Sequence, residues 1–386
     1  MDFQFTEEQT MLVDMIRKMG ERENFRDRAM RIDATGEFPE DLMIKFGELG
    51  LLGMCLGTEW GGGGQSDLNA ILVIEELAKY SPIIAGGTFE SSLGAVRIIE
   101  LFGTEAQKRS IIPGVCTGAF SVSACMTEPN AGSDLTALRT KAVDMGDHYL
   151  LNGSKVFITG GGHASHYLIY TRLNDERGYK SIGAILLEKG TPGFSFGKQE
   201  EFLGLRGMPS CELIFEDVKV PKENLVLEAG SFSKLMTVFA RERCGNAAMS
   251  LGVAGGALNE AKRYALERNA FGRPICEFQG IQFMIADMAM QLEAAQLLVY
   301  RAASNAVPGL ALVQQAAMAK CFANEMVIDV TNKAMQIFGG YGYTREFPIE
   351  RMLRDGRAWG VAGGTVQMLR VSIASTLLGR SFNQRK

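Results

Sequence analysis

The run Cys125-Met126-Thr127-Glu128-Pro129-Asn130-Ala131-Gly132-Ser133-Asp134 combines hydroxyl side chains, a proline, a glycine and carboxylates in one short segment. A loop of this composition leaves backbone N–H groups pointing outward, and the hydroxyls of Thr127 and Ser133 add further donors. Such donors can hold a polar, partly anionic cofactor without a lysine. The same residue types are also ordinary turn formers, so the run taken alone is equally consistent with a surface turn.

The spacing of apolar residues changes on either side of this run. Before it, Thr6-Glu7-Glu8-Gln9 predicts a capping box, and helical spacing is found at about 40–49, 67–80, 91–102 and 105–112. Alternating residues from about 120 to 235 predict a hairpin that turns at Asn152-Gly153 and further strands at Tyr167–Tyr170, Ile182–Leu187, Phe194–Phe196 and Cys211–Phe215. Helical spacing returns at about 232–269, 277–305, 310–338 and 364–379. The chain is therefore expected to be α+β, with helices, then a β unit, then a helical bundle.

Composition excludes several classes of function. A chain of 386 residues with 46% hydrophobic and 22% charged residues has the composition of a globular protein of two or three packed units. The net charge is −4 and no Lys/Arg-rich stripe is present, so nucleic-acid binding is not expected. No long apolar run begins the chain, so neither a leader peptide nor membrane insertion is expected.

Cysteine and histidine usage point to a reducing compartment and no metal. The seven cysteines are scattered and form no C-x-x-C pair, which favours free thiols and a cytoplasmic location. Of the three histidines, His163 and His166 lack clustered Cys or acidic partners, so no metal site is expected. The glycines 160–162 follow a strand but do not open a βαβ unit, which argues against a Rossmann fold.

Motifs along the whole length together resemble the acyl-CoA dehydrogenase family. They are Thr127-Glu128-Pro129, Gly132-Ser133-Asp134, Phe157-Ile158-Thr159, Glu267-Arg268-Asn269-Ala270-Phe271-Gly272, Gln279, Gln336-Ile337-Phe338-Gly339-Gly340, Arg354-Asp355 and Gly364-Thr365-Val366-Gln367. The resemblance implies an N-terminal all-α domain over 1–120, a middle β-barrel or β-sandwich domain over 121–231, and a C-terminal four-helix bundle over 232–386.

The resemblance also implies FAD, which lies between the β domain and the C-terminal domain in this family. Positions expected to contact FAD from the β domain are Met126, Thr127, Gly132, Ser133, Phe157 and Thr159, where Phe157 replaces the tryptophan that is frequent in the family. Those expected to hold it from a neighbouring subunit are Arg268, Phe271, Gln279, Gln336, Gly339 and Gly340, with Thr365 and Gln367 as further contacts. A cofactor shared in this way implies a homo-oligomer, and a tetramer is usual.

The catalytic base of most family members is missing. They carry a glutamate directly before the late Gly-Thr pair, and Gly363 stands there in this chain. A minority, which includes isovaleryl-CoA and long-chain acyl-CoA dehydrogenases and crotonobetainyl-CoA reductase, places its glutamate on the first long C-terminal helix, directly before an arginine. Here that pair is Glu242-Arg243, so the resemblance makes Glu242 the base, with Arg243 beside the thioester. The N–H of Gly363 remains as an oxyanion donor; an exposed charged helical turn is the alternative for Glu242.

The expected activity is α,β-dehydrogenation of an acyl-CoA, with electrons passed to an electron-transfer flavoprotein. Substrate contacts are expected from Ser133 and Arg243, and from Glu90, whose alternative is a surface or helix-capping role. The reverse reaction, enoyl-CoA reduction, stays open, as does a catalytically inert flavin-binding homologue. Monooxygenation or desulfination is disfavoured because a candidate base is present.

Overall fold

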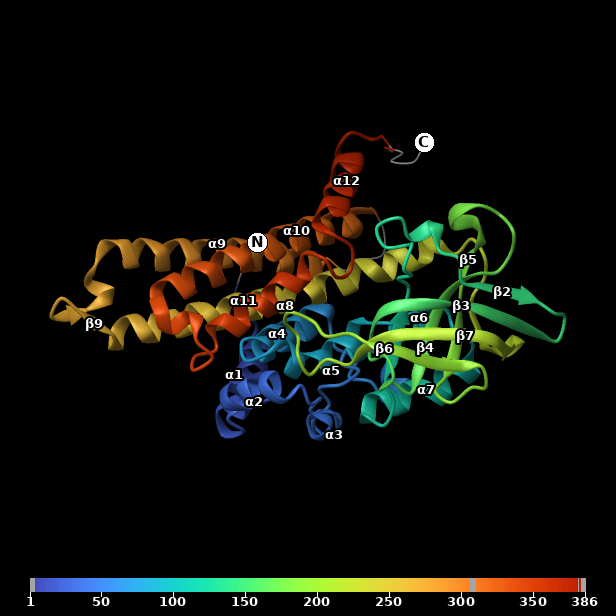
Figure 1. The fold of residues 1–386 in the computed structure, drawn as a ribbon, viewed down its shortest axis with the longest axis horizontal. Coiled ribbons are helices and arrows are strands. Elements are labelled where there is room, and N and C mark those ends of the chain that lie inside the picture. The colour runs from blue at the N-terminus through green and yellow to red at the C-terminus, as the bar shows by residue number, and fades with distance from the viewer. Residues whose placement is uncertain (1–3, 306–309, 381, 383–386) are drawn as a thin grey trace.

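The computed structural model of the protein describes residues 4–305, 310–380 and 382. Met1, Asp2 and Phe3, from which no leader is expected, lie outside these ranges. Along the chain a group of helices comes first, a β-sheet follows, and long helices complete the fold (Figure 1). This order confirms the α+β fold class predicted from the sequence.

The N-terminal part consists of helices: α1 (Glu7–Arg22), α2 (Phe25–Thr35), α3 (Glu40–Glu48), α4 (Asp67–Ala78), α5 (Pro82–Leu93), α6 (Val96–Phe102) and α7 (Glu105–Thr117). The predicted capping box is confirmed, because Gln9 N donates to Thr6 Oγ1 at 3.2 Å and Thr6 N to Gln9 Oε1 at 3.1 Å. The single helix predicted over 91–102 is wrong. α5 ends at Leu93 because Gly94 adopts an extended conformation, and α6 begins after this break.

The middle part is an eight-stranded mixed sheet with the order β6-β7-β3-β2-β4-β5-β8, and β1 pairs in parallel with β4. Its strands are β1 (Val122–Cys125), β2 (Lys141–Asp144), β3 (His148–Thr159), β4 (His166–Arg172), β5 (Ile182–Glu188), β6 (Phe194–Gln199), β7 (Ser210–Pro221) and β8 (Leu225–Leu227). The predicted hairpin at Asn152-Gly153 is wrong, since β3 runs through it. A bulge in the partner strand lies opposite, where Glu216 and Asp217 of β7 face Asn152 alone and Asp217 has φ 49°. Asn152 exchanges two hydrogen bonds with Asp217.

The C-terminal part is built on the long helices α8 (Phe232–Glu267), α9 (Gln279–Ser304) and α10 (Leu310–Phe338), with α11 (Ile349–Trp359) and α12 (Val366–Leu377). A short ribbon of β9 (Asn269–Ala270) and β10 (Arg273–Pro274) joins α8 to α9. In Figure 1, the bundle extends to the left, the β-sheet lies at the right, and α12 projects upward from their junction.

Two hydrophobic cores fix how these parts meet. Buried residues of α4 and α5 share one core with α8, α9 and α10, so the N-terminal helices pack directly on the bundle. The helices α6 and α7 share a second core with strands β4 and β5. The N-terminal helices therefore contact both the bundle and the sheet, and the junction of all three parts is held by apolar burial.

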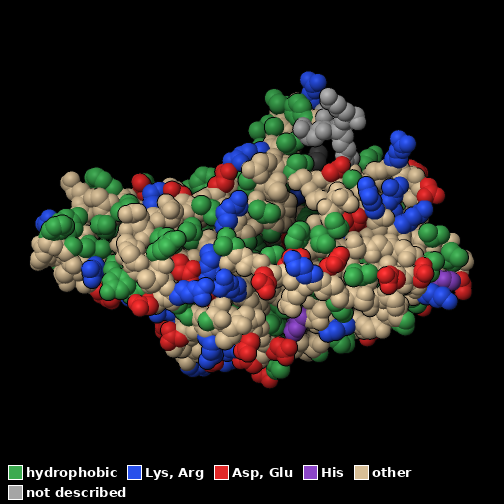
Figure 2. Space-filling model, viewed as in Figure 1, with side chains coloured by type: hydrophobic (Ala, Val, Ile, Leu, Met, Phe, Trp, Pro, Cys, Tyr) green, Lys and Arg blue, Asp and Glu red, His purple; other side chains and the backbone are tan. Residues whose placement is uncertain are grey.

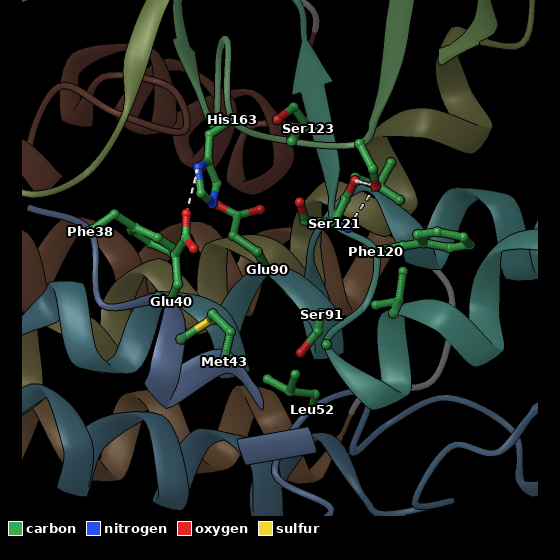
Figure 3. Close-up of a pocket in the computed structure, with 18 of the residues that line it drawn as sticks. Phe38, Glu40, Met43, Leu52, Glu90, Ser91, Phe120, Ser121, Ser123 and His163 are labelled. Atoms are coloured by element: carbon green, nitrogen blue, oxygen red, sulfur yellow. Dashed lines mark hydrogen bonds and ion pairs between the residues drawn. The ribbon is translucent and has the colours of Figure 1, made fainter. Parts of the chain in front are cut away.

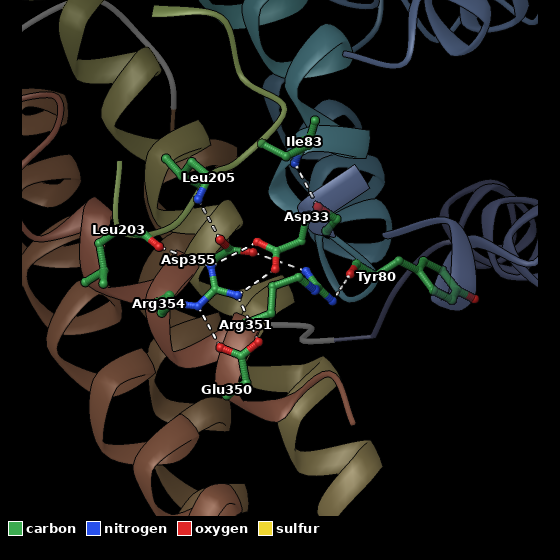
Figure 4. Close-up of polar contacts among 10 residues, drawn as sticks. Asp33, Tyr80, Ile83, Leu203, Leu205, Glu350, Arg351, Arg354 and Asp355 are labelled. Atoms are coloured by element: carbon green, nitrogen blue, oxygen red, sulfur yellow. Dashed lines mark hydrogen bonds and ion pairs between the residues drawn. The ribbon is translucent and has the colours of Figure 1, made fainter. Parts of the chain in front are cut away.

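The Arg354-Asp355 motif stabilises this junction rather than forming part of a cavity (Figure 4). Arg354 binds Asp33 of α2 at 2.6 Å and Glu350 at 2.7 Å. Asp355 accepts from Leu205 N at 2.7 Å, in the loop that joins β6 to β7, and pairs with Arg351 at 3.1 Å. One turn of α11 thus ties down an N-terminal helix and a loop of the β domain.

The surface of the molecule carries both signs of charge. On the face shown in Figure 2, Lys and Arg side chains are interspersed with Asp and Glu. Within residues 4–305, 310–380 and 382, no helix is both long enough and apolar enough to cross a membrane. The same residues contain no cluster of His, Cys, Asp and Glu with the makings of a metal site.

Candidate active site

The structure brings Glu242, on the third turn of α8, next to Gly363, in the turn between α11 and α12. A Cβ atom placed on Gly363 would lie 3.4 Å from Oε1 of Glu242, 3.4 Å from Cε of Lys320 and 3.2 Å from Nδ2 of Asn246. The Glu242 carboxylate therefore occupies the space into which a side chain at position 363 would point. Gly363 itself has φ 65°, a left-handed conformation that favours glycine.

Burial governs the electrostatics of Glu242. Loss of solvent raises the pKa of its carboxyl group to about 7, against the opposing charges of Arg243 and Lys320. No residue in the described part of the chain forms a hydrogen bond or ion pair with this carboxyl group. A carboxylate in such surroundings is poised to exchange a proton near neutral pH. The alternative of an exposed charged turn does not fit, because Arg243 is buried and Arg241, on the other side of Glu242, pairs with Asp67, whose side chain is only 9% exposed.

A buried lysine that the sequence did not single out supports this turn. Lys320 of α10 is fully buried, and its Nζ donates to the carbonyl oxygens of Trp359 and Gly364, each at 3.0 Å. Desolvation lowers the pKa of Lys320 to about 8, while the nearby Glu242 acts to raise it. A lysine buried in this way fixes the chain on both sides of Gly363 and places a cation near the Glu242 carboxylate.

Buried amides continue the same network. Asn324, one turn after Lys320, donates to Trp359 O and, at 3.0 Å, to Oδ1 of Asn246 on α8. Ser250 donates to Oδ1 of Asn324 at 2.8 Å. The signal in the sequence is that Lys320 and Asn324 stand four residues apart within the apolar run that begins at Ala316. A polar pair at this spacing lies on one helix face and needs buried partners.

Arg243 lies beside the same turn. Its side chain is 7% exposed, and its Nη2 is 4.0 Å from the position that a Cβ atom on Gly364 would take. The Nε of Arg243 is buried without a hydrogen-bond partner among the described residues. An unsatisfied buried guanidinium donor is costly, so this N–H is available to donate a hydrogen bond to a ligand atom.

A cavity of about 310 Å³ opens between the N-terminal helices and the β domain (Figure 3). Its wall is formed by α3, α5 and α7 on one side, and by β1 and the turn after β3 on the other. Glu90, near the end of α5, lines this cavity rather than the outer surface. Burial raises the pKa of Glu90 to about 8, and the negative charge of Glu242 adds to the effect.

A buried ion pair between Lys155 and Glu128 fixes the loop that follows β1. Lys155 of β3 is fully buried, and its Nζ donates to Glu128 Oε1 at 2.7 Å and to Met126 O at 3.1 Å. Glu128 also accepts from the backbone N–H groups of Arg139 and Thr140. Gly132 and Ser133 beyond it are exposed, whereas Met126 and Thr127 are half-buried.

Phe157 and Thr159 follow Lys155 on β3 and are both exposed. Phe157 is 57% exposed, and its backbone has φ 57°, which is an unusual conformation for a bulky residue. The ring lies 6.4 Å from that of Phe202. An aromatic face held outward by a strained backbone beside a donor-rich loop fits a planar heterocyclic ligand.

A second group of predicted FAD contacts lies far from this loop. Arg268, Gly339 and Gly340 line a separate pocket with Tyr341, at the β9 end of the bundle opposite the β-sheet (Figure 1). Phe271 is 95% exposed, and Gln279 and Gln336 are exposed as well. Within one chain the structure does not bring this group together with the loop after β1.

Thr365 and Gln367 lie on the turn that carries Gly363. Thr365 is the N-cap of α12, and its Oγ1 accepts from Met368 N at 3.3 Å. Gln367 is exposed in the first turn of the same helix. The unpaired N–H groups at the start of a helix favour a polar or anionic ligand atom.

Comparisons with known proteins agree with this architecture. Family models match all three parts: "Acyl-CoA dehydrogenase, N-terminal domain" over residues 6–119, the middle domain over 123–218 and the C-terminal domain over 232–378. The chain is 41% identical over 383 residues to a short-chain-specific acyl-CoA dehydrogenase of Clostridium acetobutylicum, covering 98% of this chain and 100% of that protein.

Two further relatives widen the range of activities. The CarC subunit of the caffeyl-CoA reductase-Etf complex of Acetobacterium woodii is 39% identical, over 97% of this chain and 99% of that protein. The solved structure of butyryl-CoA dehydrogenase from Megasphaera elsdenii superposes with a TM-score of 0.93 at 38% identity, covering 98% of this chain and 100% of that one. With matches that extend from residue 6 to residue 378 and a fold of the same three parts, the chain belongs to the acyl-CoA dehydrogenase family.

Proposed function

We propose that the protein is an FAD-dependent acyl-CoA dehydrogenase in which Glu242 removes the α-proton of an acyl-CoA thioester. The observation that carries this proposal is the position of Glu242 Oε1, 3.4 Å from the site of a Cβ atom on Gly363. The carboxylate lies where the glutamate of most family members would project, although it comes from another helix. A pKa of about 7 lets it accept a proton near neutral pH.

The surrounding residues have complementary roles in this proposal. The N–H of Gly363, held by the contacts of Lys320 on either side, donates to the thioester oxygen as enolate charge develops. Arg243 contributes a buried positive charge near the thioester, and Ser133 contacts the CoA arm. When bound, FAD supplies the acceptor for the β-hydride. Electrons then leave to an electron-transfer flavoprotein, in line with the Etf complex of the CarC relative.

FAD binding needs more than one copy of the chain. The loop with Met126, Thr127, Gly132 and Ser133, together with Phe157 and Thr159, forms one face, which Thr365 and Gln367 extend. The other contacts, at the far end of the bundle, are Arg268, Phe271, Gln279, Gln336, Gly339 and Gly340. Because these two groups are at opposite ends of one chain, we infer that two subunits complete each site, in a homotetramer (Figure 1).

A reducing compartment fits the thiols of the protein. The seven cysteines are all free, and six of them are buried. Burial raises the pKa of several of these thiols, to about 12 for Cys55 and about 11 for Cys116, which makes them unreactive. We therefore infer a cytoplasmic location, where free thiols persist.

The same residues would also catalyse the reverse reaction, the reduction of an enoyl-CoA. The similarity to a subunit of a caffeyl-CoA reductase complex supports this reaction as a second candidate function. The residues would be the same, but Glu242 would have to start protonated. An inert flavin-binding homologue is disfavoured by the convergence of Glu242, Lys320 and Gly363 on one point. Desulfination is disfavoured for the same reason, since it requires no α-proton base.

We expect an anaerobic titration of the purified holoenzyme to bleach its flavin absorbance with at least one acyl-CoA. The panel contains short, branched, cyclic and polar-tailed thioesters, each compared with its enoyl-CoA. Bleaching by an acyl-CoA supports the dehydrogenase. Reoxidation of dithionite-reduced enzyme by an enoyl-CoA alone supports the reductase, and a flavin that responds to neither would contradict both.

The pH dependence should separate the two directions. Because the pKa of Glu242 is raised to about 7, its base form is depleted below that pH, and the rate of flavin reduction by acyl-CoA should rise through about pH 7. Flavin oxidation by enoyl-CoA needs the acid form and should fall over the same interval. Stopped-flow absorbance at saturating substrate measures both.

A variant of Lys320 tests the assignment of that transition. The positive charges that act on Glu242 are those of Arg243 and Lys320, and Glu90, whose pKa is raised to about 8, is the neighbouring acid. Lys320→Met removes a cation that lowers the Glu242 pKa, so the midpoint should move to higher pH. Glu90→Gln should leave the midpoint nearly in place, because Glu90 is mainly uncharged at that pH. A midpoint unchanged in Lys320→Met would show that the observed transition belongs to another group.

A further inference from the structure

Glu90 presents a carboxyl group to the cavity without any partner. It lies on the last turn of α5, lines the cavity and receives no hydrogen bond or ion pair from a described residue (Figure 3). The next two residues on the helix already have other partners. Ser91 Oγ accepts a hydrogen bond from Gly53 N and Ser92 Oγ accepts one from Met54 N, each at 3.1 Å. Glu90 is therefore free to interact with whatever fills the cavity.

The rest of the cavity wall offers Glu90 no counter-ion. Much of the lining is apolar and includes Met43, Leu52, Val96 and Met208, and no Lys or Arg is among the lining residues. The other lining carboxylate, that of Glu40, faces His163 at 3.8 Å. A carboxyl group in apolar surroundings without a cation stays protonated at neutral pH. Glu90 therefore presents one O–H donor and one carbonyl acceptor to a ligand.

An alkyl chain packed against this wall would leave both groups unsatisfied. A buried polar group without a hydrogen-bond partner carries a large desolvation penalty, and a site built around such a group rejects ligands that cannot pair with it. An anionic tail would instead be buried without any cation to balance it. A neutral hydrogen-bonding group satisfies Glu90 and adds no charge to the cavity.

We propose that Glu90 is a specificity-determining residue, which selects acyl-CoA thioesters whose acyl group carries an uncharged hydrogen-bonding group, such as an amide, hydroxyl or keto group. The inference rests on the proposed function, because it takes the ligand to be an acyl-CoA. It narrows that function from acyl-CoA thioesters in general to those with a polar, neutral acyl substituent. Glu90 contacts the acyl group and not the thioester, so its contribution lies in binding.

Isosteric thioesters test the proposal. Glutaramoyl-CoA, 5-methylhexanoyl-CoA and glutaryl-CoA end in an amide, an isopropyl group and a carboxylate of nearly the same shape. Each is titrated by calorimetry into holoenzyme that carries Glu242→Gln, so that binding is measured without turnover. The same three ligands with one more methylene are titrated as well, so that two chain lengths are compared for the one that brings the terminal group to Glu90. We expect the amide to bind about tenfold more tightly than the isopropyl ligand at the favoured length, with the carboxylate weakest.

Two substitutions at Glu90 then separate hydrogen bonding from packing. Glu90→Leu should reverse the order, so that 5-methylhexanoyl-CoA binds more tightly than glutaramoyl-CoA, while Glu90→Gln should keep the preference for the amide. Thermal melting of each variant confirms that it folds. An unchanged ranking in Glu90→Leu overturns the proposal, and so does a wild-type preference for the carboxylate or for a matched trimethylammonium tail. If no thioester of any kind binds, the proposed function itself fails.

Discussion

Replacing Glu242 by glutamine should slow the reduction of the flavin by an acyl-CoA about a hundredfold to ten-thousandfold, the range that a positioned general base contributes. The amide has nearly the shape of the carboxylate, so it fits beside Gly363, but it cannot accept the α-proton. Binding of the thioester should change little, because Arg243 and the Gly363 N–H are untouched. Single-turnover flavin bleaching measures the rate, and the same titration gives the dissociation constant.

A glutamate outside the candidate site serves as a control. Glu293 of α9 is exposed and belongs to none of the family motifs, so Glu293→Gln should leave the rate of flavin reduction at the wild-type value. Exchange of the substrate α-proton with D₂O, followed by NMR, gives a second readout and should be lost only in Glu242→Gln. If the Glu242→Gln enzyme keeps both exchange and bleaching, the base lies elsewhere.

The position of the proposed base illustrates how much of the site the sequence alone can indicate. That position 363 lacks a carboxylate is visible in the sequence, and so is the Glu242-Arg243 pair. What only the structure shows is that the two positions meet in space, 121 residues apart along the chain. The alignment of two helices and a turn at one point depends on packing across a shared core, which no local pattern records.

The errors in predicting the fold have the same origin. Asn152-Gly153 has the composition of a tight turn, but pairing with a bulge at Asp217 of β7 keeps it inside a continuous strand. The spacing of apolar residues runs across Gly94, yet the helix ends before it. In both places local preference was outweighed by contacts with residues distant in the sequence. Long, strongly periodic segments such as α8 and α10 were predicted to within a few residues.

The supporting residues of the site were missed for a related reason. Lys320 and Lys155 look like ordinary surface lysines in the sequence, because most lysines are exposed. Both are fully buried, and each donates to backbone carbonyl oxygens of a loop in the candidate site. Only the backbone oxygen atoms that they bind reveal this role, and those atoms are common to every residue type.

Replacing Lys155 by methionine should have the largest effect on the integrity of the protein. The substitution leaves the Glu128 carboxylate in the interior, where it keeps only the N–H groups of Arg139 and Thr140. Removing one partner of a buried ion pair lowers the free energy of unfolding by about 3–5 kcal/mol, which is a large part of the stability of a typical domain. The loss of the bond to Met126 O should also free the loop after β1, so the purified protein should contain less flavin.

The exposed pair Lys141–Asp175, at 2.6 Å, offers a matched control on a neighbouring strand. Lys141→Met should change the free energy of unfolding by less than about 1 kcal/mol, since solvent already screens this pair. Adding Glu128→Gln to Lys155→Met removes the uncompensated charge while keeping an acceptor for the two N–H groups, so it should restore part of the lost stability. Urea unfolding and the flavin-to-protein absorbance ratio measure the two effects separately. If the double variant is as unstable as Lys155→Met, the loss of stability comes from the packing of the lysine side chain and not from the unpaired charge. If the Lys155→Met protein keeps the wild-type flavin content, the loop after β1 does not depend on this ion pair.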